Sequence, residues 1–422
     1  MNLKPFWQGD TLPETSTSVD LPRRVDVVVL GGGFTGLSSA YHLALAGASV
    51  ALLEAGFLGS GASGRNGGMV LTGLKEDVLT LRKKYGLERA KALFASSLEA
   101  IALTRELVGE DQAECGFHQS GHLEMAAKPH HYDRMLRVAE QLERQHGHPV
   151  QMIDRADQQR EIGSAEFFGG MLDTASCSIQ PWQYVQHLAK LARSVGAVIV
   201  ENTPAVKITR TPSGYNIHTK QGDVECEQVV LASGAYTHPN LNGIRQKFFE
   251  IGSFIGCTRP LPADLAKSLI PNRRMVFDTN NHLVYFRLTD DGRMLFGGRA
   301  AFGREPEKAL AESMPILQKA MIRIYPVLAG EQFDYGWAGS LDVTASTLPK
   351  IYTSDGITTA IGFAGHGVAM ASLFGKLISR QIMLGERSLY HVDHLPSVPL
   401  PWFRPIYLPF VGAYYQWMDK WA

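Results

Sequence analysis

The sequence predicts an α/β protein with a second, α+β domain, and three observations support this fold class. The chain has 422 residues, too many for one hydrophobic core. Near the N-terminus an apolar run over 25–30 leads into glycines and then into an amphipathic stretch, which is the order strand, turn, helix. Between 249 and 298 the apolar residues alternate in longer runs, as strands do. We therefore expect two domains of different construction.

The first glycine-rich turn has the pattern of a Rossmann-like dinucleotide-binding fold. Gly31 allows the tight turn, and Gly33 lets the backbone approach a pyrophosphate closely. Gly36 lets the helix pack closely on the strand. A second strand, over 49–53, runs into Glu54, where a carboxylate accepts ribose hydroxyls. The alternatives are a turn without a ligand and, for this motif alone, an NAD-dependent dehydrogenase. The predicted adenine-dinucleotide contacts are Gly31, Gly33, Phe34, Thr35, Gly36 and Glu54.

Apolar spacing predicts the remaining elements in order. Apolar residues at three- and four-residue intervals indicate helices, and short alternating runs indicate strands. Asp290-Asp291-Gly292 marks a hairpin turn between two of the strands. Helices are expected over 77–108, 131–145, 181–195 and 305–325. Strands are expected over 121–125, 197–201, 205–210, 215–219, 224–229, 275–278, 283–288 and 294–297.

A second glycine-rich segment, residues 59–68, follows the acidic end of the second strand. Its five glycines exclude regular structure and let the backbone come very close to a planar or anionic group. Arg65 suits a phosphate and Asn66 a ring edge. The alternative is a flexible surface loop, but a loop at the carboxyl edge of such a sheet lies where ligands bind. The predicted contacts are Ala62, Ser63, Arg65, Asn66, Gly67 and Gly68.

A third segment, residues 361–370, runs from a strand through glycines into an apolar helix. Gly365 and Gly367 leave free backbone N–H groups at the N-terminus of that helix, which suits delocalised negative charge. A reduced flavin carries such a charge around N1 and the C2 carbonyl oxygen. His366 either borders the ring or is a hydrogen-bonded turn histidine. The predicted contacts are Gly365, His366, Gly367 and Val368.

Composition excludes several other classes. Lysine plus arginine equals aspartate plus glutamate, at 41 each, so no basic field would attract nucleic acid or anionic lipid. The four cysteines lie far apart with no metal-ligand spacing, which predicts reduced thiols, a cytoplasmic location and no metal site. Residues 1–24 lack the apolar core of a signal peptide, and no run of 18 apolar residues occurs, so membrane association is not expected.

Four motifs together resemble the D-amino-acid oxidase (DAO) superfamily of FAD-dependent oxidoreductases. They are VVVLGGGFTGLSSAYHLALAGASVALLEA, GASGRNGGMV, VVLASGAYT and GFAGHGVAMA. The resemblance spans residues 25–384 and implies a two-domain fold of the DAO and glutathione-reductase type, with a mixed-sheet substrate domain over the flavin. It adds Val206, Ser233 and Gly234 to the FAD contacts. The implied limits are 20–75, 150–235 and 336–390 for the FAD-binding domain, 76–149 and 236–335 for the substrate domain, and 391–422 for a C-terminal tail docking on the body.

Within the superfamily, the chain is most similar to gamma-glutamylputrescine oxidase-like proteins, through IGCTRPL, YFRLTDDGRMLFGGR, WAGSLDVTASTLPKI and FVGAYYQWMDKW. The arginine that clamps an α-carboxylate in glycine and D-amino-acid oxidases has no counterpart over 339–344, which disfavours free α-amino acids. No cysteine lies over 336–368, so we expect non-covalent FAD. Leu295 stands near the oxygen-activating lysine of sarcosine oxidases. Ser346 and Thr347 replace the arginine or asparagine usual in the closer relatives.

The resemblance implies hydride transfer from the carbon beside an amine nitrogen to the flavin, after which the imine is hydrolysed. Candidate catalytic residues are Tyr285, Arg299 and His366; for the first two, structural roles are the alternatives. Arg287 shares a face with Tyr285 and is either a pocket residue or a surface cation or ion-pair partner. Asp342 is either a partner of a substrate ammonium group or structural. The expected partners are a small-molecule amine and either O2 or an electron-transfer acceptor; the oligomeric state is open. The alternatives are a D-amino acid or sarcosine-like substrate, and a non-catalytic flavin-binding protein.

Overall fold

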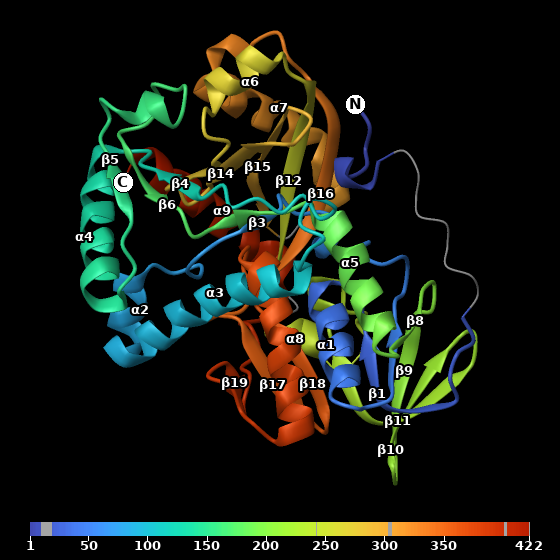
Figure 1. Cartoon of the computed structure of the whole chain (residues 1–422). Coiled ribbons are helices and arrows are strands. Elements are labelled where there is room, and N and C mark those ends of the chain that lie inside the picture. The colour runs from blue at the N-terminus through green and yellow to red at the C-terminus, as the bar shows by residue number, and fades with distance from the viewer. Residues whose placement is uncertain (10–18, 242, 303–305, 401–402, 422) are drawn as a thin grey trace.

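The computed structural model describes residues 1–9, 19–241, 243–302, 306–400 and 403–421. Two sheets dominate it (Figure 1), one with α6 and α7 beside it and the other with α1, α5 and α8. The helices are α1 Phe34–Leu45, α2 Val78–Tyr85, α3 Leu87–Val108, α4 Pro129–His146, α5 Pro181–Ser194, α6 Ala263–Leu269, α7 Pro306–Ile324, α8 Gly367–Leu384 and α9 Arg404–Trp421.

The nine-stranded sheet has a parallel centre in the order β18-β11-β1-β2-β8. Its central strands are apolar along most of their length because both faces are covered. Val27 and Val29 of β1 pack with α1, α5 and α8, whereas Val28 and Leu30 pack on the opposite side. The strands are β1 Arg24–Leu30, β2 Val50–Leu53, β8 Val198–Val200, β9 Ala205–Thr211, β10 Gly214–Thr219, β11 Asp223–Leu231, β17 Lys350–Ser354, β18 Ile357–Ile361 and β19 His391–Val392.

The eight-stranded sheet runs in the order β16-β12-β15-β14-β13-β4-β6-β5. Alternate residues of its strands, such as Leu123, Val276, Phe286 and Phe296, form a core with α6 and α7. We call the opposite side of this sheet its inner face. The strands are β4 His122–Met125, β5 Gln151–Ile153, β6 Gly170–Asp173, β12 Phe249–Pro260, β13 Met275–Asp278, β14 Val284–Leu288, β15 Arg293–Phe302 and β16 Phe333–Val343. A short pair, β3 Met69–Val70 and β7 Cys177–Ser178, lies apart.

The structure differs from the sequence-based expectations in several elements. The helical stretch expected over 77–108 is broken at Gly86, whose φ of +80° ends α2 and starts α3. Strands β5 and β6 were not expected, because each is short and its apolar residues show no period. The domain limits stay a prediction; β5, β6 and most of β16 pair in the eight-stranded sheet although they fall inside the limits given for the FAD-binding domain.

Both ends of the chain contact the eight-stranded sheet. The N-terminal turn, η1 Phe6–Gln8, packs beside β12 and β16, and helix α9 contacts β15. Asp419 of α9 accepts hydrogen bonds from the backbone N–H groups of Asn281 and His282, both at 2.8 Å. The other side of α9 exposes an apolar row of Phe403, Ile406, Phe410, Tyr414 and Trp417. Within the described ranges, no helix is both long and apolar enough to cross a membrane.

Candidate functional site

The first glycine-rich turn brings β1, α1 and the end of β11 into backbone contact. Gly31 has φ +113°, and a Cβ on it would lie 2.9 Å from the carbonyl oxygen of Ala232. A Cβ on Gly36 would lie 1.9 Å from the carbonyl oxygen of Gly31, so the helix can start here only with glycine. Ser233 and Gly234 follow Ala232, so this predicted pair lies beside the turn.

Glu54 lies at the end of β2 and holds the same turn. Its carboxylate accepts hydrogen bonds from the backbone N–H groups of Gly32 at 2.6 Å and Gly56 at 2.8 Å. The backbone N–H of Thr203 donates to the carbonyl oxygen of Glu54 at 2.8 Å, so β9 begins next to this carboxylate. Val206 of β9, a predicted contact, is 43% exposed. The acidic end of β2 thus has the position that a ribose-binding carboxylate needs.

The second segment is held in one shape by its own side chains. Asn66 donates to the carbonyl oxygens of Ala62 at 3.1 Å and Ser63 at 2.8 Å, and it accepts from the N–H of Gly68 at 2.8 Å. The Ser63 hydroxyl accepts from the N–H of Phe34 at 3.0 Å. This places the segment against the N-terminus of α1. The alternative of a flexible surface loop is not what the structure shows.

Two arginines join this segment to the eight-stranded sheet. Arg65 donates to the carbonyl oxygen of Ala338 on β16 at 3.0 Å. Arg287 of β14 donates to the carbonyl oxygens of Gly67 at 2.7 Å and Ile179 at 2.9 Å. Arg287 is 5% exposed, and burial lowers its pKa to about 10, so the interpretation as a surface cation is wrong. Because the Nε and Nη2 groups of Arg287 both donate to backbone carbonyl oxygens, this side chain positions the loop of the second segment.

The third segment ends β18 and begins α8. Gly365 has φ +93°, and a Cβ on it would meet nothing within 4 Å. Asp342 of β16 accepts from the N–H of Gly362 at 2.7 Å, and its own carbonyl oxygen accepts from the N–H of Ala364 at 3.2 Å. Asp342 therefore shapes the turn before α8. Of its two interpretations, this supports the structural one over a partner for a substrate ammonium group.

His366 is the residue that precedes α8. Burial lowers its pKa to about 4, and the positive charge of Lys75 adds to the fall. The Nδ1 atom of His366 is buried and has no hydrogen-bond partner within the described part of the chain. The imidazole is therefore neutral at pH 7 and stands at the positive end of the helix dipole.

Tyr285 lies on the inner face of the eight-stranded sheet, between two glycines. A Cβ on Gly297 would lie 2.2 Å from the ring, and a Cβ on Gly67 would lie 3.1 Å from it. Burial raises the pKa of Tyr285 to about 12. The ring thus occupies the space that Gly297 of β15 leaves by having no side chain. It also lies beside Gly67 in the loop of the second segment. Arg299 belongs to β15, but its side chain lies outside the described residues.

Sequence reasoning missed three residues near these segments. Trp7 donates to the carbonyl oxygen of Asn66 at 2.8 Å, and its ring lies under the Arg287 guanidinium at 5.2 Å. Lys75 and Glu124 are the other two: the charge of Lys75 lowers the pKa of His366 and opposes the rise in the pKa of Glu124. The alternation His122, Leu123, Glu124 was a signal that two polar side chains share one face of β4.

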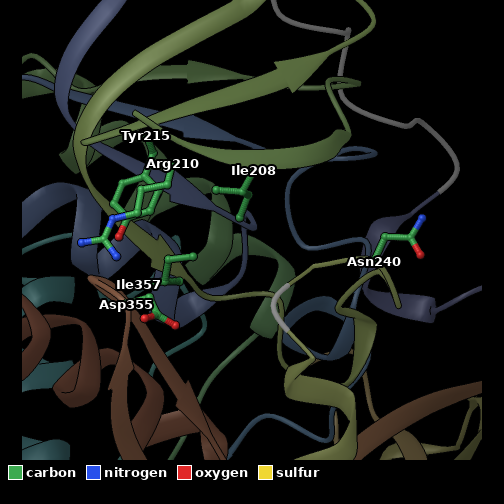
Figure 2. Close-up of a pocket in the computed structure, with 6 residues that line it drawn as sticks. All are labelled: Ile208, Arg210, Tyr215, Asn240, Asp355 and Ile357. Atoms are coloured by element: carbon green, nitrogen blue, oxygen red, sulfur yellow. The ribbon is translucent and has the colours of Figure 1, made fainter. Parts of the chain in front are cut away.

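A hollow of about 300 Å³ lies elsewhere, where β9 and β10 meet the turn between β17 and β18 (Figure 2). It contains none of the predicted contacts, and Asn240 stands apart from its other lining residues. We assign no function to it. Its lining residues are Ile208, Arg210, Tyr215, Asn240, Asp355 and Ile357.

The three segments fit a flavin dinucleotide. Helix α1 begins after Gly33 and helix α8 after His366, and neither has a side-chain cap from that residue or an acidic residue in its first turn. Uncapped N–H groups at a helix N-terminus need acceptors, and a phosphate or an anionic ring supplies them. A Cβ on Gly33 would lie 2.8 Å from the Ser63 hydroxyl oxygen. A side chain at this position would therefore fill the space through which a phosphate approaches the backbone.

Comparison with known proteins agrees with this geometry. The DAO family, described as FAD dependent oxidoreductase, matches residues 26–381. Gamma-glutamylputrescine oxidoreductase of Escherichia coli (strain K12) is 32% identical over 97% of this chain and 95% of its own length. Glycine oxidase of Bacillus subtilis (strain 168) is 24% identical over 87% and 95%. The crystal structure of glycine oxidase from Geobacillus kaustophilus superposes with a TM-score of 0.72 at 22% identity, over 90% of this chain and 99% of that chain. The chain therefore belongs to the DAO family of FAD-dependent oxidoreductases.

Proposed function

We propose that the enzyme oxidises the C–N bond of an amine. The observation that carries this proposal is the placement of the Tyr285 ring on the inner face, in contact with the Gly67 loop. That contact puts a sheet of side chains directly over the segments that would hold FAD, which is the arrangement a substrate needs to lie between them. When bound, FAD supplies a two-electron acceptor for the reaction.

The charge state of His366 does not oppose the binding of an amine. His366 is uncharged at neutral pH because burial lowers its pKa, so it does not repel an incoming cationic substrate. In the proposed reaction the amine loses two electrons and two protons and becomes an imine. Water then hydrolyses the imine to a carbonyl compound and releases ammonia from a primary amine or an amine from a secondary one. Either O2 or an electron-transfer acceptor takes the electrons afterwards.

We favour a gamma-glutamylated or similar amine over a free α-amino acid. The 32% identity to gamma-glutamylputrescine oxidoreductase supports this choice. The α-carboxylate clamp is absent over 339–344, and Arg287 already donates to two carbonyl groups. A carboxylate left unpaired near the reacting carbon would be costly. A D-amino acid or sarcosine-like substrate is the second candidate, and it would require Arg299.

We also propose that FAD is held without a covalent bond. None of the four cysteines lies over 336–368, and all four are buried free thiols. Acid precipitation of the purified protein should leave the yellow colour in the supernatant. Flavin that stays with the precipitated chain would contradict this part of the proposal.

The proposed reaction is tested by mixing the holoenzyme anaerobically with single amines and following the flavin absorbance. The panel is gamma-glutamylputrescine, putrescine, sarcosine and D-alanine. We expect gamma-glutamylputrescine to bleach the flavin fastest. If D-alanine or sarcosine is fastest, the second candidate holds, and an Arg299→Ala variant should then lose that activity. No bleaching by any amine would contradict amine oxidation.

A further inference from the structure

One row of residues crosses the inner face of the eight-stranded sheet and carries partly exposed side chains. Strand register aligns Glu124 of β4 with Phe277 of β13, Phe277 with Tyr285 of β14, and Tyr285 with Gly297 of β15. Residues aligned in this way point to the same face. The next residues along these strands, Leu123 and Val276 among them, point into the core with α7.

The accessible surface of this row borders space inside the molecule. Glu124, Phe277 and Tyr285 each keep partial exposure, although they stand in the middle strands of the sheet. Burial nevertheless raises the pKa of Glu124 to about 7 and that of Tyr285 to about 12. A side chain that is both accessible and deep within the fold lines an internal space. The row is therefore a wall of the substrate site, with Tyr285 near the flavin loop and Glu124 at the far end.

Lys75 is a cation whose charge acts on Glu124. It follows β3 and precedes α2, so it belongs to the glycine-rich side of the site. Its side chain is exposed, yet burial lowers its pKa, which again indicates an internal surface. Lys75 is electrostatically coupled to Glu124 and also to His366 at the start of α8. The site thus holds a carboxyl group with a pKa of about 7 and an amine group at the end away from Tyr285. A substrate ammonium group beside Glu124 would favour its ionised form.

Neither side chain contributes a hydrogen bond or an ion pair to the described part of the fold. Among the described residues, the side chains of Glu124 and Lys75 have no hydrogen-bond partner and no ion-pair partner within 4 Å. Arg134, the other cation near Glu124, donates to the carboxylate of Asp77 through its Nε at 3.0 Å. Unpaired charges in such a place are costly unless a ligand completes them.

We propose that Glu124 and Lys75 form a distal subsite that binds the α-ammonium and the α-carboxylate at the far end of an amide-linked amine. This inference rests on the proposed function and names the chemistry of the substrate's non-reacting end. Glu124 accepts from the ammonium group and Lys75 donates to the carboxylate. Both are charge-assisted hydrogen bonds, the stronger class.

The length of such a substrate fits the row. Glu124 and Tyr285 are two strands apart, and neighbouring strands lie about 4.8 Å apart, so their backbones are separated by about 10 Å. In gamma-glutamylputrescine, eight bonds join the oxidised carbon to the glutamyl Cα. An extended chain of that length spans about 9–10 Å. The reacting end can therefore lie beside Tyr285 while the amino-acid end reaches Glu124.

The test compares ligands that differ only at the far end. Gamma-glutamylputrescine carries both charges there, glutarylputrescine lacks the ammonium, 4-aminobutyrylputrescine lacks the carboxylate, and N-acetylputrescine lacks both. Dissociation constants come from calorimetry on the FAD-loaded enzyme, and limiting reduction rates from anaerobic mixing. For the native enzyme we expect gamma-glutamylputrescine to bind at least roughly tenfold more tightly than N-acetylputrescine.

Two variants assign the partners. Glu124→Gln should weaken gamma-glutamylputrescine roughly tenfold but leave glutarylputrescine and N-acetylputrescine within about twofold. Lys75→Gln should weaken gamma-glutamylputrescine but leave 4-aminobutyrylputrescine unchanged. Limiting reduction rates are measured for both variants in the same series, so that a change in substrate binding is separated from a change in the reaction step. Matched controls are Glu140→Gln and Lys91→Gln, whose side chains are exposed on α4 and α3.

Each outcome either supports or overturns the distal subsite. Equal binding of all four ligands to the native enzyme overturns the subsite, as does a loss in the variants that is the same for every ligand. Calorimetry needs no turnover, so the subsite is judged even if no amine reduces the flavin. In that case the proposed reaction fails by itself. Selective binding with flavin reduction supports both proposals, and reduction without selectivity overturns only the subsite.

Discussion

The first glycine-rich turn and the inner face of the eight-stranded sheet are the two sides of the proposed flavin site, but they are built from different parts of the chain. Around Gly31 and Gly36 the close contacts are between backbone atoms, at distances that no side chain could share. On the inner face the contacts come from side chains aligned across strands, such as Tyr285 over Gly297. Backbone contacts tolerate one residue type, whereas a side-chain wall can change with the substrate.

The largest effect is expected from Gly36→Ala, which tests the backbone contacts of the first glycine-rich turn. The added Cβ would lie 1.9 Å from the carbonyl oxygen of Gly31, so α1 must move away from the turn. We expect FAD affinity to fall roughly hundredfold or more. The measurement is the ratio of flavin to protein absorbance after gel filtration, with circular dichroism to check folding.

The control for that variant is Gly330→Ala. Gly330 has no atom within 4 Å of a built Cβ and does not have positive φ, so the methyl group fits. It should keep the native flavin content. A Gly36→Ala enzyme that is isolated with full flavin would show that the backbone approach is not needed.

Gly297→Ala tests the substrate side. Its Cβ would lie 2.2 Å from the Tyr285 ring, so the ring must leave its place in the row. We expect the rate of flavin reduction by substrate to fall roughly tenfold to hundredfold while FAD content stays native. Anaerobic stopped-flow measurements on the holoenzyme give the rate. Loss of FAD together with the rate would mean that the two regions are not separable.

The two regions also differ in how far the sequence predicted them. The nucleotide side follows from local patterns, since Gly31, Gly36 and Glu54 have their roles within one strand–turn–helix–strand unit. The inner face depends on the register of strands far apart in the sequence, and pairing of Glu124 with Phe277 cannot be derived from local alternation. For the same reason, the loop-holding role of Arg287 became apparent only when β14 and residue 179 were placed together.

Arg287→Ala should damage the connection between the two regions. It would leave the carbonyl oxygens of Gly67 and Ile179 without their charged donor and remove a buried guanidinium from beside Trp7. We expect a loss of about 2–4 kcal/mol in the free energy of unfolding. Chemical denaturation of the holoenzyme measures it. Arg259→Ala, at a surface pair with Glu331, should lower the stability much less, and equal losses in both variants would contradict the assignment.

The smallest expected effect concerns the acid–base state of Glu124. Burial raises its pKa to about 7 from an ordinary 4.5, with Asp77 adding to the rise and Arg134 and Lys75 opposing it. The folded protein therefore holds this proton more tightly than the unfolded chain. The stability that comes from the neutral carboxyl is present below pH 4.5 and is lost as the pH rises through about 7.

Glu124→Gln removes this titration and keeps the shape of the side chain. Without substrate, the variant should match the native enzyme near pH 4.5 and exceed its stability by about 1–3 kcal/mol at pH 8. Thermal or denaturant unfolding at the two pH values gives the difference, and Glu140→Gln, an exposed position on α4, is the control. An offset that does not change with pH, or a variant less stable at pH 8, would mean that Glu124 has a partner in the fold and is not held ready for a ligand.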